Sequence, residues 1–169
     1  MRLRLLAKAI LLVALESLCT AGATEASRLG AIEALANGTS YAEDMHIAAN
    51  NLMQMINGGA LSSDETLRAI LIVDAANSVN HVTRGLMALG LIYLRVKHPD
   101  DRELVADTLA MVATESTQEF DREIGDFNIY TPAIDNPAVT KEATRISESV
   151  HKLRQLVDAV AGQFPRKSK

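Results

Sequence analysis

Residues 62–97 of the chain read SSDETLRAILIVDAANSVNHVTRGLMALGLIYLRVK. Apolar side chains recur in this stretch at alternating steps of three and four, at Ile72, Ala75, Val79, Val82, Leu86, Leu89, Tyr93 and Val96. An α-helix turns once every 3.6 residues, so this spacing places all of them on one stripe. At 1.5 Å per residue the helix would be about 50 Å long. The stretch therefore predicts an all-α fold built on long helices.

Three more long segments show the same spacing, and one short segment precedes them. The five expected helices cover residues 25–36, 40–56, 62–97, 99–128 and 137–164, and turn-forming residues separate them. Ser40 with Glu43, and Ser62 with Glu65, have the spacing of a capping box at a helix start. Apolar steps of three and four in helices joined by short connections are typical of helix bundles. We expect an antiparallel up-down bundle of four long helices plus a short N-terminal helix.

The first 23 residues have the three parts of a bacterial export signal. Positive side chains come first, then an apolar run, then a small-residue site: Arg2, Arg4 and Lys8; AILLVAL at 9–15; AGA at 21–23. Cleavage would fall before Thr24, although Glu16 interrupts the usual pattern. The sequence predicts a signal peptide over 1–23, a single bundle domain over 24–169, and a periplasmic or secreted protein. The alternative is an ordinary first helix packed on the bundle.

Composition and charge exclude several classes of function. Cys19 is the one cysteine of the chain, so a processed protein would form no disulfide. The net charge is −4, and loss of three basic residues and one acidic residue with the leader would make it −6. A nucleic-acid surface needs clustered positive charge, so we expect no nucleic-acid partner. The apolar runs 69–73 and 86–94 are separated by charged residues, which argues against a membrane span in the mature chain.

A Glu-x-x-His spacing occurs twice, at Glu43 with His46 and at Glu148 with His151. Di-iron four-helix bundles use this spacing, so these four residues are metal-ligand candidates. Each Glu, however, lies two positions from residues of the apolar stripe, which turns it to the opposite side of its helix. The sequence therefore predicts two exposed Glu–His pairs, with no metal and no other cofactor. A metal- or haem-binding bundle in electron transfer or storage is the alternative function.

Four polar residues, Asp74, Asn77, His81 and Arg84, follow one face of the long helix. They could form an acid–base array, but a solvated face or a polar seam against a neighbouring helix is the commoner meaning of such a stripe. No Gly-x-Ser-x-Gly or Ser-x-x-Lys motif frames a nucleophile. We therefore do not expect an enzyme.

The segment 86–94 is apolar on every side, whereas a bundle helix needs one apolar stripe. Either the short helix 25–36 covers its outer side or another chain does, and Gly85 and Gly90 would permit close approach. Exposed apolar patches commonly mark interaction sites. The pattern favours a homodimer through Ala88, Leu91 and Ile92.

The stretch 128–137 (NIYTPAIDNP) is the longest expected connection, and two prolines stiffen it. Tyr130 and Ile134 are candidates for a second contact site on this stretch, but a plain connection with Tyr130 packed on the bundle is the favoured interpretation. Taken together, the sequence predicts an exported helical bundle that acts through protein–protein contacts, as an adaptor, inhibitor, chaperone or immunity protein does.

Overall fold

The computed structural model describes residues 24–165, and every regular element in that range is helical. The elements are α2 (Glu25–Asn37), α3 (Thr39–Asn57), α4 (Ser63–Arg95), α5 (Pro99–Tyr130), the 3₁₀ turn η1 (Thr131–Ala133) and α6 (Pro137–Gln163). The predicted all-helical bundle of four long helices and a short first helix is thus confirmed for this range. The expected signal peptide, residues 1–23, lies outside the described residues.

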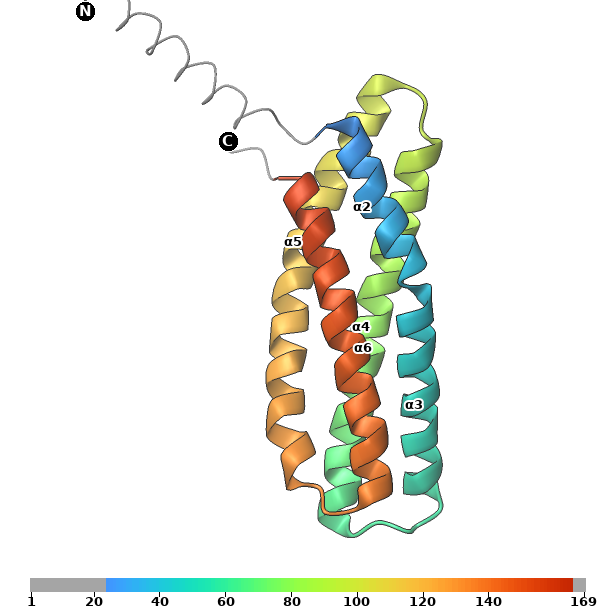
Figure 1. The fold of residues 1–169 in the computed structure, drawn as a ribbon, viewed down its shortest axis with the longest axis vertical. Helices are drawn as coiled ribbons and strands as arrows, with labels where there is room; N and C mark the ends of the chain where they lie inside the picture. The colour runs from blue at the N-terminus through green and yellow to red at the C-terminus, as the bar shows by residue number, and fades with distance from the viewer. Residues whose placement is uncertain (1–23, 166–169) are drawn as a thin grey trace, which may run out of the picture.

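The four long helices lie side by side, and α2 covers one end of the bundle (Figure 1). Around the bundle, α3 contacts α4 and α6, and α5 contacts the same two helices from the other side. The α3–α4 and α5–α6 connections lie at the lower end in Figure 1, and the α4–α5 connection lies at the upper end. Within residues 24–165 no helix is long and apolar enough to cross a membrane.

The apolar stripes of the long helices meet in the centre of the bundle. In α6 the whole predicted stripe is buried: Val139, Ala143, Ile146, Val150, Leu153, Val157, Val160 and Phe164. In α4 the buried members are Ile72, Ala75, Val79, Leu86 and Tyr93. Removing this apolar surface from water is the main force that holds helices together, because most helical stability in proteins comes from packing an amphipathic face. The outer face of each helix is left for other roles.

One predicted capping box is present and the other is not. Ser62 and Glu65 cap each other reciprocally at the start of α4. The box expected at Ser40 is absent, since α3 begins earlier, at Thr39. The reason is Gly38, whose helical φ of −70° carries the chain from α2 into α3 with almost no break. A Cβ atom there would lie 2.5 Å from a methyl group of Leu156, so the absence of a side chain lets this junction pack closely against α6.

The connection between α5 and α6 is shorter than expected. The helix α5 continues to Tyr130, and η1 then folds the chain back toward the bundle. The interpretation of Ile134 as an exposed contact residue is wrong, because its side chain is only 6% exposed. Its backbone N–H donates to the Thr131 carbonyl at 3.2 Å, and its carbonyl accepts from the Thr140 hydroxyl at 3.1 Å. These local bonds turn Ile134 inward, and Tyr130 is partly buried against the same core.

Candidate functional site

The metal-ligand candidates all lie on outer surfaces. Glu43 and His46 are exposed on α3, and Glu148 and His151 are exposed on α6, as their positions off the apolar stripes predict. The His46 imidazole Nε2 lies 3.2 Å from the side-chain amide of Asn50 on its own helix. Among residues 24–165 no three His, Cys, Asp or Glu side chains gather closely enough to hold a metal ion. The structure therefore does not bring these four residues into one site.

The C-terminal part of α4 is covered on one side only. A Cβ atom at Gly90 would lie 2.9 Å from Cγ2 of Ile32, so α2 packs tightly on this side of the helix. The other side is open, and Leu91 and Ile92 are 46% and 48% exposed there, with Ala88 also exposed. The sequence allows two ways to cover this segment, and the structure shows one of them: α2 packs on the side that carries Gly90 and Tyr93. Leu91 and Ile92 remain an apolar patch on the surface.

Farther along α4, the polar stripe lies on the outer surface rather than between helices. Asp74, Asn77, His81 and Arg84 are all exposed. Within the described part of the chain none of these four side chains forms a hydrogen bond or ion pair. A cavity of about 330 Å³ runs beside His81 and Gly85, and Glu115 and Glu119 of α5 line its other wall. The stripe thus provides charges that residues 24–165 leave unpaired.

Two apolar side chains that were not singled out from the sequence extend this outer face toward the start of α4. Leu67 and Ile70 are 59% and 44% exposed. Leu67 also borders a cavity of about 190 Å³, together with Asp64, Arg68, Leu71 and Tyr130. The signal that could have found them is a second series of steps of three and four, offset from the buried stripe. The outer face of α4 is therefore apolar at both ends and polar in the middle.

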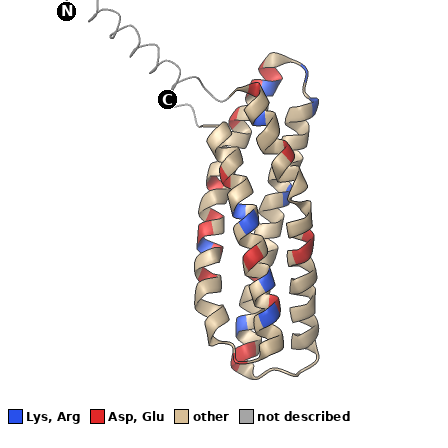
Figure 2. Ribbon diagram, in the orientation of Figure 1, with Lys and Arg blue, Asp and Glu red and all other residues tan. Residues whose placement is uncertain are grey.

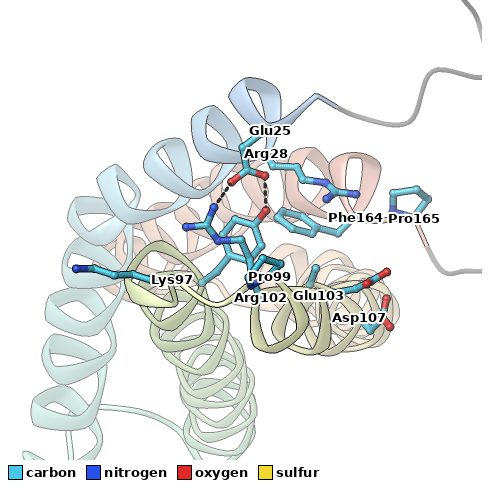
Figure 3. Close-up of a pocket in the computed structure, with 11 residues that line it drawn as sticks. Glu25, Arg28, Lys97, Pro99, Arg102, Glu103, Asp107, Phe164 and Pro165 are labelled. Atoms are coloured by element: carbon cyan, nitrogen blue, oxygen red, sulfur yellow. Dashed lines mark hydrogen bonds and ion pairs between the residues drawn. The ribbon is translucent and has the colours of Figure 1, made fainter.

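A second candidate site lies at the end of the bundle that α2 covers, in a cavity of about 290 Å³ (Figure 3). Its centre is the Glu25 carboxylate, at the start of α2. The Tyr93 hydroxyl donates to Glu25 Oε2 at 2.6 Å, and Arg102 Nη1 donates to Oε1 at 3.1 Å. Both carboxylate oxygens are therefore occupied by donors from α4 and α5.

Aromatic contacts complete this cluster. The rings of Tyr93 and Phe164 meet edge to face, with centroids 5.2 Å apart, and the Arg28 guanidinium lies over the Phe164 ring. Arg28 also donates to the Gln163 carbonyl at 3.2 Å, which ties α2 to the end of α6. Burial raises the pKa of the Tyr93 hydroxyl above its ordinary value of 10.0, and the hydrogen bond to Glu25 adds to that shift. The cluster therefore holds α2, α4, α5 and the end of α6 together, because its central polar atoms form hydrogen bonds with one another.

Figure 2 shows acidic and basic residues interspersed along the helices. Neither candidate site contains positive charge only. The outer face of α4 includes Asp74, and the end cavity includes Glu25, Glu103 and Asp107. No protein-family model, curated protein or solved structure matches the chain.

Proposed function

We propose that this protein is exported from a bacterial cytoplasm and acts through protein–protein contacts made by the outer face of α4. The observation that carries the proposal is the apolar patch of Ala88, Leu91 and Ile92, which stays exposed although α2 packs on the other side of the same turns. Exposed apolar side chains gathered in this way are characteristic of interaction surfaces. An adaptor, inhibitor, chaperone or immunity protein would use such a surface without catalytic groups.

Export is supported by the cationic start, the apolar run and the small-residue site before Thr24. A chain that begins at Thr24 also retains its own helix cap. The Thr24 hydroxyl oxygen accepts a hydrogen bond from the Ser27 backbone N–H at 3.2 Å, at the first turn of α2. Processing at this point would therefore leave α2 with its N-terminal cap in place.

The proposal is tested by expressing the full chain in a bacterium with a photoreactive amino acid in place of Ile92. We expect intact-mass measurement to show protein that lacks residues 1–23 in the extracytoplasmic fraction. Irradiation should then join position 92 covalently to a protein, whereas the same label at Glu148, on the outer face of α6, should give much less adduct. Cytosolic protein that retains residues 1–23, or equal labelling at the two positions, would contradict the proposal.

A further inference from the structure

The exposed positions along the outer face of α4 form a series whose steps are the same when it is counted from either end. Its eight positions are Leu67, Ile70, Asp74, Asn77, His81, Arg84, Ala88 and Leu91, separated by steps of 3, 4, 3, 4, 3, 4 and 3 residues. All eight are exposed. Steps that alternate in this way form the seam of a two-stranded coiled coil, in which side chains of one helix pack between those of another. The series is centred on residue 79, and it spans roughly 36 Å at 1.5 Å per residue.

The chemistry of these positions is complementary across that centre. Reversing the helix about residue 79 brings Leu67 to Leu91 and Ile70 to Ala88, which places apolar beside apolar. It also brings Asp74 to Arg84, a pair of opposite charges, and Asn77 to His81, a pair that can share a hydrogen bond. Two adjacent α4 helices that run in the same direction would instead place Asp74 beside Asp74 and Arg84 beside Arg84. Like charges so placed are unfavourable, so the charges select the antiparallel arrangement.

We infer that the partner of this surface is a second copy of the chain. The two α4 helices would pack antiparallel on their outer faces, about a two-fold axis that passes between Asn77 and His81, at the level of residue 79 along the helix. The inference rests on the proposed function, in that it takes the same outer face as the contact surface. The four layers on each side of the axis are Leu67 with Leu91 of the second copy, Ile70 with its Ala88, Asp74 with its Arg84, and Asn77 with its His81. A two-fold interface of this kind closes on itself and yields a dimer.

Residues at the margin of the seam fit the same arrangement. Ser78 and Gly85 lie along the margin of the seam that faces α5, and a Cβ atom at Gly85 would meet nothing within 4 Å among the described residues. Small residues there let the two helices approach closely. Leu71 lies along the same margin, and with Leu67 and Tyr130 it lines the cavity of about 190 Å³. Leu91, near the C-terminal end of one α4, would thus pack beside the cavity that Leu67 lines near the start of the other α4.

Charge reversal gives a test that depends on the register. Asp74→Arg places two arginines together in both copies of that layer, and Arg84→Asp places two aspartates together. We expect each variant alone to self-associate at least roughly tenfold more weakly than the wild type. Mixing the two variants should restore association, because in both layers an arginine of one chain then faces an aspartate of the other. Native mass spectrometry would identify this heterodimer by its intermediate mass, with light scattering for the wild-type dimer.

Glu148→Arg and Lys152→Asp are the matched controls, since they make the same charge changes on the exposed face of α6. They should remain dimeric. A wild-type monomer, single variants that stay dimeric, or a mixture that does not associate would each overturn the inference. These measurements use purified full chain processed by the host, with no other protein present. Their failure would leave the photo-crosslinking result at position 92 standing, and so separates this inference from the proposed function.

A second measurement keeps the wild-type charges and does not depend on the folding of the reversed variants. In a Cys19→Ser background, the double variant Ile70→Cys/Ala88→Cys should oxidise to a covalent dimer, because the two cysteines meet across the seam. Ile70→Cys alone should not, since its two copies would be roughly 27 Å apart along the helix at 1.5 Å per residue. A covalent dimer from the single variant would indicate parallel helices and overturn the inference.

Discussion

At the scale of single residues, Glu65 joins two connections at the lower end of the bundle. Its Oε2 accepts from the backbone N–H and the hydroxyl of Ser62, at 3.1 and 2.9 Å. Its Oε1 accepts from the backbone N–H of Asn136, the residue that caps α6, at 3.1 Å. These bonds, the backbone N–H of Ser62 first among them, lower the pKa of the Glu65 carboxyl below its ordinary value of 4.5. One carboxylate therefore helps to position the starts of both α4 and α6.

The direction of that pKa shift sets the direction of a pH effect. A carboxyl whose pKa is lower in the folded state contributes stability above its unfolded pKa and loses it as pH falls through the folded pKa. Glu65→Gln should therefore lower the free energy of unfolding at pH 7 and lose less stability than the wild type between pH 7 and acid pH. Urea unfolding at both pH values measures this. Glu148→Gln, which changes an exposed carboxylate on α6, is the control, and an equal acid response in the two variants would refute the prediction.

At the scale of elements, two glycines with different surroundings show where one helix packs closely on another. Gly90 lies where α2 crosses α4, and a Cβ atom there would lie 2.9 Å from Ile32 Cγ2, a methyl group on a stiff β-branched side chain. Gly125, on α5, has open space in the same position. Both lie inside long helices, where alanine is favoured over glycine by about 1 kcal/mol. Alanine substitution at the two positions therefore separates the effect of close packing on stability from the effect of helix propensity.

Gly125→Ala should raise the free energy of unfolding by up to about 1 kcal/mol, because it gains helix propensity and meets no neighbour. Gly90→Ala should gain less or lose stability, since α2 has to move away from α4 to make room. Hydrogen exchange should then show faster exchange in α2 and little change in α5. Equal stabilisation by the two substitutions would mean that α2 does not pack tightly on Gly90.

At the scale of the whole molecule, the cluster at the upper end joins segments that are far apart in sequence. Tyr93 and Arg102 reach Glu25 across 68 and 77 residues, and Phe164 adds the end of α6. Long-range bonds of this kind hold the short helix α2 onto the bundle, since α2 makes few contacts with its neighbour α3. The same cluster makes the stability of the protein sensitive to high pH, because its central hydroxyl must keep its proton.

A tyrosine whose pKa is raised on folding contributes stability that is complete below its unfolded pKa, near 10, and is lost as pH rises through the folded pKa. Tyr93→Phe removes one hydrogen bond and should cost about 1 kcal/mol at pH 7. It should also reduce the loss of stability between pH 7 and pH 11, measured by urea unfolding. Tyr41→Phe, at a side chain that is 37% exposed, is the control. An unchanged alkaline response in Tyr93→Phe would contradict this role.

The sequence alone determined the helices and their buried sides, because both depend on periodicity within a few turns. The apolar stripe of α6, the capping box at Ser62 and the Asn136-Pro137 start of α6 are local patterns of this kind. The outward position of the Glu–His pairs follows from the same periodicity. The expected helix over residues 25–36 ends within one residue of the end of α2.

Which distant segments come together depends on how the helices pack in three dimensions, and no local pattern predicts it. Ile134 is apolar in a connection, and its burial depends on how η1 turns it toward the core. Glu25, Tyr93 and Arg102 have no common sequence pattern, since their contact exists only once α2, α4 and α5 are packed. Likewise, α2 covers Gly90 but leaves Leu91 exposed because a helix packed on one side of another shields only the residues that face it.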